Sequence, residues 1–215
     1  MEEYIKIEHL KKRFKDNEVL EDVSLSCRRG AIYGVTGYNG CGKSVFFKCL
    51  CGLEKEDSGK IVIGGKEKKP GELLSSAGII IEEPAFLGNA GGLKNLAYLY
   101  QIRNKKDNRY LSRIMEQVGL DPGSKKYVKK YSLGMRQRLA IAQAIMEEPD
   151  ILILDEPMNG LDKDGVREMR ELFLKIREIG KTILMASHNR EDIEVLCDEV
   201  YEMEKGRLCR ISPAI

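Results

Sequence analysis

A glycine-rich segment contains the residues whose types and spacing point most directly to chemistry. Residues 37–44 read GYNGCGKS and fit the pattern G-x-x-x-x-G-K-[S/T]. The segment follows an apolar stretch, residues 31–37, and precedes another apolar run that is typical of a helix. Successive backbone N–H groups can surround a phosphate in such a loop, because glycine tolerates the positive φ angles that the curvature requires. The sequence therefore predicts a nucleotide phosphate site.

Two side chains in this loop have predicted roles beyond the backbone. A helix beginning near Lys43 would add unpaired N–H groups and a partial positive charge at its N-terminus. We expect Lys43 to reach the β- and γ-phosphates and the Ser44 hydroxyl to ligate Mg²⁺. A glycine turn that merely joins a strand to a helix is the alternative, and the adjacent lysine and serine argue against it. The expected nucleotide-binding residues are Gly37, Tyr38, Asn39, Gly40, Cys41, Gly42, Lys43, Ser44 and Val45.

Two neighbouring carboxylates follow an apolar run about 110 residues further along the chain. Residues 151–156 read ILILDE, which is typical of a strand buried on both faces that delivers Asp155 at its end. Asp155 is expected to hold Mg²⁺ through water, since this ion favours oxygen ligands and keeps several waters. Glu156 is expected to polarise the attacking water in phosphoryl transfer. An acidic turn after a core strand would explain a lone pair of this kind, but the upstream glycine loop favours the catalytic interpretation.

His188 is one of only two histidines and follows the apolar run TILMAS. A lone histidine is more often structural than catalytic. Its position at the end of a predicted strand, where ligands of parallel sheets gather, raises the weight of a catalytic role. From the residues alone, both interpretations stay open.

Alternating strand-like and helix-like segments must position these residues. Strand patterns occur in the first forty residues, at 61–65, 78–83, 151–157 and 182–188, and in a final hairpin over 200–211. Helical periodicity fills residues 90–148 and returns at 164–180 and 190–197. Strands and helices on both sides of a helical block predict an α/β fold with a parallel sheet and an inserted helical lobe. We expect one domain, with a core formed by 1–89 and 149–215 and the lobe by 90–148.

Composition excludes several classes of protein. Lys plus Arg number 36 against 34 for Asp plus Glu, so the net charge of +2 disfavours a dedicated binder of nucleic acid or anionic lipid. The basic run at 125–130 is therefore expected to be a solvated surface rather than a nucleic-acid patch. No apolar run approaches the roughly 20 residues that span a bilayer. The six cysteines form no zinc-like pair and are expected to be reduced thiols.

Taken together, these residues resemble the ATP-binding subunits of ABC transporters over nearly the whole chain. The discriminating segment is YSLGMRQRL at 131–139, which resembles the family signature, usually L-S-G-G-Q. Ser132 and Gly134 match, whereas Tyr131, Leu133 and Met135 depart in a way similar to the bacitracin and lantibiotic-immunity branch. The resemblance implies a P-loop NTPase core with a mixed sheet, an N-terminal antiparallel β subdomain and an inserted helical subdomain.

The family resemblance also implies roles for residues that spacing does not explain. Two subunits would sandwich two ATP molecules, and Ser132, Gly134 and Met135 would contact the ATP held by the partner. From the sequence alone, Ser132 is only a predicted helix N-cap. Asp162, in NGLD, matches a dimer-contact loop usually written S-A-L-D, although Asn159 and Gly160 differ. Phe14 falls where the family has an adenine-stacking aromatic, and a core phenylalanine is the equally weighted alternative.

One departure from the family concerns the metal site. The family has a glutamine at the end of the strand over 78–81, where it contacts Mg²⁺ and joins the core to the helical lobe. Glu82 takes that position here, and a register shift of one would assign the role to Glu83. A carboxylate is a stronger Mg²⁺ ligand than an amide but adds negative charge near the γ-phosphate.

The resemblance implies an ATPase that uses ATP and Mg²⁺, forms a homodimer with ATP bound and drives a separate transmembrane permease. Glu156 and His188 would be catalytic, and the segment from Glu82 to Asn95 would face the permease. The protein is expected to be cytoplasmic and peripheral on the inner face of the membrane, exporting an antimicrobial peptide or drug without binding nucleic acid. The alternatives are a soluble ABC ATPase acting on ribosomes or DNA, and a nucleotide kinase or GTPase that shares only the glycine loop.

Overall fold

The fold described here comes from a computed structural model, which describes residues 3–82 and 85–211. Within these ranges the chain forms ten strands, six α-helices and one 3₁₀ helix. In chain order the elements are β1 (Glu3–Phe14), β2 (Asn17–Arg28), β3 (Ile32–Thr36), α1 (Lys43–Cys51), β4 (Ser58–Ile63), β5 (Lys66–Lys68), β6 (Ala77–Ile80), α2 (Gly92–Tyr100), α3 (Asn108–Gln117), η1 (Val128–Lys130), α4 (Leu133–Ile145), β7 (Ile151–Asp155), α5 (Lys163–Glu178), β8 (Thr182–Ala186), α6 (Arg190–Leu196), β9 (Glu199–Glu204) and β10 (Arg207–Ile211).

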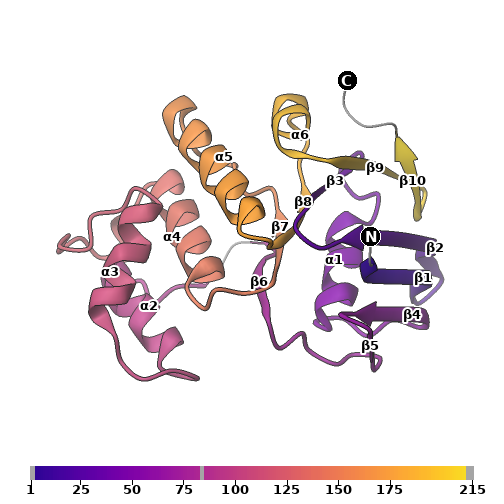
Figure 1. Cartoon of the computed structure of the whole chain (residues 1–215), viewed down its shortest axis with the longest axis horizontal. Coiled ribbons are helices and arrows are strands. Elements are labelled where there is room, and N and C mark those ends of the chain that lie inside the picture. The colour runs from indigo at the N-terminus through magenta and orange to yellow at the C-terminus, as the bar shows by residue number, and fades with distance from the viewer. Residues whose placement is uncertain (1–2, 83–84, 212–215) are drawn as a thin grey trace.

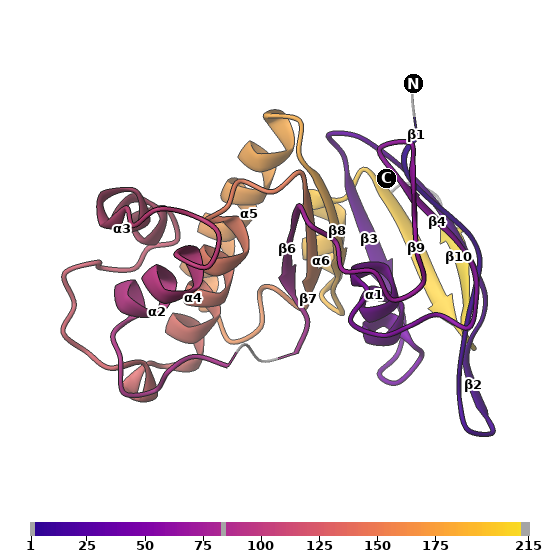
Figure 2. The ribbon, with the colours of Figure 1, turned by 90° about the horizontal axis from the view of Figure 1, so that it is seen from below.

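The strands form one mixed sheet in the order β5-β4-β1-β2-β10-β9-β3-β8-β7-β6. The strands β9, β3, β8, β7 and β6 pair in parallel, whereas β5, β4, β1 and β2 pair antiparallel. Figures 1 and 2 show the antiparallel strands at one end of the molecule and α2, α3 and α4 at the other. The predicted fold class is therefore confirmed, including the antiparallel β subdomain.

The central strands are buried on both faces, as their continuous apolar runs predict. Along β7, Ile151 and Ile153 belong to the apolar core that contains α1 and the antiparallel strands. Leu152 and Leu154 point the other way, into a second core that they share with the helical segments. Because side chains alternate along a strand, one sheet separates two cores and carries both. The carboxyl ends of β3, β7 and β8 consequently lie at one edge of a rigid layer.

The helices of the predicted lobe lie within the predicted range of 90–148. Leu96 of α2, Met115 of α3 and Leu139 of α4 are buried in the core that also contains Leu152 and Leu154 of β7. The helical segment is thus packed onto the sheet through a continuous apolar core, with α4 between the sheet and the other two helices (Figure 1). The domain boundaries themselves remain a prediction.

Three local predictions need correction or completion. The strand predicted over 78–83 ends at Ile80, so Glu82 follows the strand by two residues. The short strand β5 was missed because its sequence, KEK, lacks the apolar alternation that marks a half-buried strand. The basic run at 125–130 is solvent-exposed as predicted, except that Val128 is buried in the helical core.

Candidate nucleotide site

The glycine loop over 37–44, called here the phosphate loop, joins the end of β3 to the start of α1. Gly37 has φ 139° and Gly42 has φ 113°, both in the region that favours glycine. A Cβ atom on Gly37 would lie 2.4 Å from the carbonyl oxygen of Met203, so a larger residue would displace β9. Helix α1 begins at Lys43, and among the described residues no side chain caps its first turn. The N–H groups at this end are therefore free of side-chain competition for an anion.

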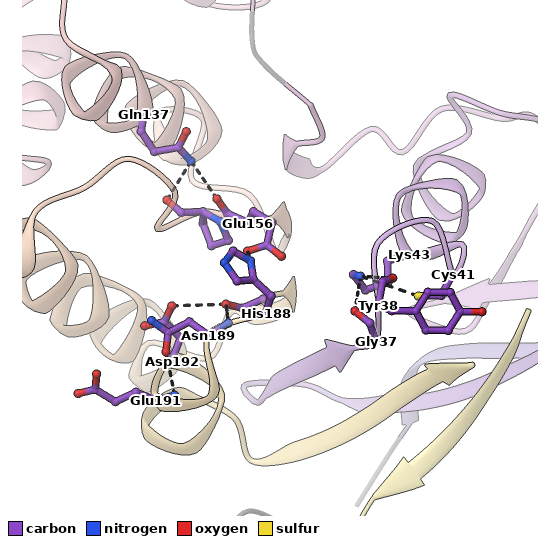
Figure 3. A network of polar contacts seen from close by, with 12 residues as sticks. Gly37, Tyr38, Cys41, Lys43, Gln137, Glu156, His188, Asn189, Glu191 and Asp192 are labelled. Carbon is purple, nitrogen blue, oxygen red and sulfur yellow. Dashed lines mark hydrogen bonds and ion pairs between the residues drawn. The ribbon is translucent and has the colours of Figure 1, made fainter. Parts of the chain in front are cut away.

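Lys43 is held inside the phosphate loop. Its Nζ donates hydrogen bonds to the carbonyl oxygens of Gly37 at 2.7 Å and Tyr38 at 3.2 Å, and it lies 3.8 Å from the Sγ of Cys41 (Figure 3). The side chain is buried although lysine is mostly exposed in proteins. Its positive charge consequently stays at the centre of the loop.

The two motifs predicted to bind nucleotide and metal meet at one contact. The hydroxyl of Ser44, in the first turn of α1, donates to Oδ2 of Asp155 at 2.5 Å. Asp155 is the last residue of β7, and the chain brings it across 111 residues of sequence separation. A hydroxyl and a carboxylate oxygen are ligands that suit Mg²⁺, which usually takes few protein ligands and keeps its waters. No group of three or more metal-binding side chains occurs in the described parts of the chain.

Glu156 and His188 lie side by side at the ends of neighbouring strands β7 and β8. His188 Nδ1 is 2.8 Å from Oε2 of Glu156 (Figure 3). The backbone of Glu156 has φ 49°, an unusual value for a residue with a Cβ atom, and its N–H donates to the carbonyl oxygen of Ala186 at 2.9 Å. The predicted catalytic pair is therefore in direct contact.

The turn that contains His188 is held in place by buried polar contacts with α6 and α5. Ser187 is buried, and its Oγ accepts from the Asn189 N–H and lies 3.4 Å from Oδ2 of Asp192. Asp192 is also buried and pairs with Arg170 of α5, whose Nε donates to it at 2.8 Å. The hydrogen bond with Glu191, together with this pairing, raises the pKa of the Arg170 guanidinium. This anchoring orients the exposed His188 ring at the sheet edge.

A cavity of about 530 Å³ opens at this edge. Most of the predicted phosphate and metal residues line it together with several that were not predicted, and the lining is Val19, Asn39, Gly40, Gly42, Lys43, Ser44, Val45, Ile80, Glu82, Leu133, Gln137, Asp155, Glu156 and Asn159. The signature residues Ser132, Gly134 and Met135 lie outside this lining. The cavity thus joins the phosphate loop to the carboxylates, while the signature serine of the same chain is not part of it.

Glu82 lies at the rim of the cavity and pairs with Lys48 of α1, whose Nζ is 2.5 Å from its Oε1. The Glu82 side chain is 67% exposed. Lys48 was not predicted, although it lies one helical turn after Ser44 and therefore on the same face of α1. The alternative residue for this role, Glu83, lies outside the described residues.

The signature and dimer-contact residues begin two helices. Ser132 is the N-cap of α4 and accepts from the Met135 N–H at 3.2 Å, as predicted. Asp162 is the N-cap of α5 and accepts from the Gly165 N–H at 2.8 Å. The two helices, to which the family resemblance gives different functions, therefore begin in the same way, with a short polar N-cap side chain.

Phe14 is the last residue of β1, at the tip of the hairpin with β2. Its side chain is not in either core, because the residue is 42% exposed, so the interpretation as a core phenylalanine is wrong. One neighbour of its ring is Lys12, whose Nζ lies 4.8 Å from the ring centroid. Tyr38 of the phosphate loop is exposed as well. Both aromatics are available to a ligand or to another protein surface.

The family model described as ABC transporter matches residues 20–159. That range is more than half of the chain and runs from β2 through the phosphate loop and the signature segment to the residues after Glu156. The chain belongs to the ABC transporter family. Among residues 3–82 and 85–211, none of the helices of this ABC cassette combines the length and apolar character that crossing a bilayer requires.

Curated relatives extend this assignment along the chain. The cassette is 41% identical over 206 residues to an uncharacterised ABC transporter ATP-binding protein, YybJ, of Bacillus subtilis, covering 95% of this chain and 94% of YybJ. It is 39% identical to the bacitracin transport ATP-binding protein BcrA of Enterococcus faecalis, covering 97% of this chain and 68% of BcrA. It is 36% identical to the lantibiotic transport ATP-binding protein SrtF of Streptococcus pyogenes, covering 95% and 88%. The alternative of an ATPase acting on ribosomes or DNA finds no support in these relatives.

Solved structures agree with the observed architecture. The bacterial ABC transporter cassette MJ0796, solved as a dimer, superposes with a TM-score of 0.88 at 19% identity and covers 98% of this chain and 99% of that one. A nucleotide-free ATP-binding cassette gives a TM-score of 0.84 at 23% identity, covering 96% and 90%. At these identities the likeness establishes the ABC cassette fold.

Several residues of the ABC cassette site escaped sequence reasoning. Val19 reaches the cavity from β2, and Leu133 and Gln137 reach it from α4. The position of Lys48 could have been predicted from the sequence, because it lies four residues after Ser44 on the same helix face. The others could not, because their places depend on how β2 and α4 pack against the sheet rather than on local spacing.

Proposed function

We propose that this chain is the ATP-hydrolysing subunit of an ABC exporter and acts as a homodimer on a separate membrane permease. The single observation that carries the proposal is the meeting of three motifs at one sheet edge. Ser44 bonds Asp155, Glu156 contacts His188, and Lys43 is bonded inside the phosphate loop. This arrangement supports the proposal, because it would combine a phosphate site, a metal site and a water-activating carboxylate in one cavity.

The proposed mechanism assigns a role to each of these side chains. Lys43 and the N-terminus of α1 bind the β- and γ-phosphates of ATP. Ser44 and Asp155 would hold Mg²⁺, with Glu82 at the rim as a further candidate, and the ion supplies positive charge to the phosphate oxygens. The Glu156 carboxylate accepts a proton from the attacking water, and His188, held at its side, contacts the γ-phosphate. Phe14 stacks on the adenine.

The second half of each site would come from the partner subunit. In one chain, Ser132, Gly134 and Met135 do not line the cavity that contains Lys43. A symmetric dimer in which Ser132 and the α4 N-terminus meet the partner's ATP would complete both sites, with Asp162 in the contact. The dimeric state of MJ0796, whose fold this cassette shares, supports the proposal.

The permease and the cargo follow from the family and its relatives. The segment from Glu82 to Asn95 would face the permease at the inner surface of the membrane. Asn95 is buried and bonds both the N–H and the carbonyl of Leu87, and the Leu87 side chain is exposed in that segment. Because relatives at 36–39% identity are named for bacitracin and lantibiotic transport, we infer that the exported cargo is a peptide antibiotic.

Replacement of the proposed base tests this function. Glu156→Gln removes the proton acceptor while keeping size, so ATP hydrolysis should fall by at least about 100-fold. ATP binding should persist, and the stalled protein should elute as a dimer in ATP and as a monomer without it, as measured by size-exclusion chromatography with light scattering. Cells carrying this variant should also become sensitive to bacitracin-type or lantibiotic peptides.

Glu171→Gln is the matched control, because it makes the same charge change on the exposed surface of α5 and should behave as wild type. Wild-type hydrolysis by Glu156→Gln would contradict the base role. A strictly monomeric Glu156→Gln at saturating ATP would contradict the dimer.

A further inference from the structure

Gln137 connects the signature helix of the chain to the catalytic segment of the same chain. It lies in α4, five residues after Ser132. Its Nε2 donates to the carbonyl oxygen of Pro157 at 2.9 Å and lies 3.5 Å from the carbonyl oxygen of Glu156 (Figure 3). The side chain therefore contacts the backbone carbonyl oxygen of the proposed base itself and that of the residue after it.

The backbone that Gln137 contacts is in an unusual conformation. The positive φ of Glu156 places a residue with a Cβ atom in the left-handed region, which is sterically unfavourable for such residues. Its N–H is bonded to Ala186 of β8, and its C=O side is contacted by Gln137 of α4. Such a conformation persists only where the surroundings hold it. Gln137 supplies the contact from the helical side.

The start of α4 packs on the same segment at a second place. A Cβ atom on Gly160 would lie 2.4 Å from Cγ of Leu133, and one on Gly134 would lie 2.9 Å from the carbonyl oxygen of Gly160. Leu133 thus occupies the space directly over Gly160. Together with the Gln137 contacts, this makes residues 132–138 and 156–162 one packed unit, called here the α4–loop unit.

This unit contains groups that belong to two different ATP sites. Ser132 caps α4 at one end of it, and Glu156 starts the loop at the other. We propose that Gln137 is a positioning residue that connects the start of α4 to the loop beginning at Glu156. Through this connection, contact between Ser132 and the partner's ATP sets the orientation of Glu156 toward the chain's own ATP. The inference rests on the proposed function, because it uses the roles given there to Ser132 and Glu156.

Three substitutions at this position separate a positioning role from a structural one. Gln137→Met keeps the length and removes the donor, Gln137→Lys keeps a donor, and Gln137→Glu replaces the donor by an acceptor facing carbonyl oxygens. Gln143→Met is the control, because it makes the same change six residues later in α4, outside the α4–loop unit. The measurements are steady-state kcat, KM and Hill coefficient for ATP, the unfolding temperature, and ATP-driven dimerisation of Gln137→Met combined with Glu156→Gln.

Gln137→Met and Gln137→Glu should lower kcat about tenfold, since one hydrogen bond of roughly 1.4 kcal/mol in the transition state corresponds to that factor. KM should change less than about twofold, and the Hill coefficient should fall toward 1. Gln137→Lys should recover most of kcat, and Gln143→Met should match wild type. The combined variant should dimerise at the same ATP concentration as Glu156→Gln alone.

Wild-type kcat and Hill coefficient in both Gln137→Met and Gln137→Glu would overturn the inference. So would equal losses in Gln137→Lys and Gln137→Glu, which keeps the comparison decisive even where Gln137→Met unfolds at a lower temperature. These outcomes are distinct from a failure of the proposed function, which appears in Glu156→Gln with Gln137 intact.

Discussion

The phosphate loop and the α4–loop unit differ in how closely they follow the family patterns. The phosphate loop keeps every fixed position of its motif and ends in Lys43 and Ser44. The α4–loop unit departs at Leu133, Met135, Asn159 and Gly160, yet it is closely packed. Both regions are proposed to contact the same ATP molecules from opposite subunits.

The difference reflects two kinds of constraint. In the phosphate loop, backbone geometry and one lysine must fit a phosphate, so a larger residue at Gly37 would collide with β9. In the α4–loop unit, side chains mainly have to fit each other. A larger residue on one side of a contact can therefore be compensated by a smaller residue on the other side. A leucine where the family has glycine therefore faces a glycine where the family has alanine. Two departures from the pattern become one compensated contact.

The largest expected effect concerns the phosphate loop. Lys43→Ala removes a buried cation proposed to bond two phosphates, and charged hydrogen bonds contribute about 1.5–3 kcal/mol each. ATP affinity should fall roughly 100-fold, as measured by equilibrium titration with a fluorescent ATP analogue. Lys175→Ala, on the exposed surface of α5, is the control and should leave affinity unchanged. Comparable affinity in the two variants would show that the phosphate loop binds nucleotide without its lysine.

A smaller effect is expected in the α4–loop unit, where the compensated contact can be broken and repaired. Gly160→Ala places a Cβ atom against Leu133 at a φ of 78°, so ATPase activity should fall about tenfold and the unfolding temperature should drop. Adding Leu133→Gly should restore part of both losses, because the collision disappears while the strained φ remains. Thermal unfolding and steady-state hydrolysis of the two single variants and the double variant measure the coupling. Purely additive losses would contradict the contact.

The smallest effect is expected at the helix cap between the two regions. Ser132→Ala removes the N-cap of α4 and should cost about 1 kcal/mol, which lowers the unfolding temperature by roughly 2–4 °C for a chain of this size. Ser132→Gly is the sharper variant, because glycine restores most of the capping stability but not the hydroxyl. Its ATPase activity should remain several-fold below wild type. Full activity in Ser132→Gly would mean that Ser132 only caps its helix.

The sequence was informative where function depends on local spacing. The glycine pattern located the phosphate loop, apolar runs located β3, β7 and β8, and the residues that end β7 and β8 predicted the contact edge. Charged β5 was missed because it has no apolar alternation, and β6 was predicted too long because its apolar run continues past Ile80, where the strand ends.

The tertiary part of the site could not be derived in the same way. The bond between Gln137 and Pro157 spans 20 residues, and the Leu133–Gly160 contact joins two segments that the sequence suggests only as unrelated departures from family patterns. Periodicity placed α4 but did not determine which of its residues meet the segment after β7. The exposure of Phe14 likewise depends on where the β1–β2 hairpin ends relative to the core.

The internal bonds of Lys43 bear on the thermodynamics of nucleotide capture. Immobilising a long flexible side chain costs about 0.5–1.5 kcal/mol on association. Here the ammonium group donates to the carbonyl oxygens of Gly37 and Tyr38 within its own loop. When a triphosphate binds, Lys43 would therefore exchange its carbonyl acceptors for phosphate oxygens. No mobile lysine side chain has to be ordered at that moment. Most of that entropic loss is therefore incurred during folding, and the phosphate loop is preorganised for a triphosphate.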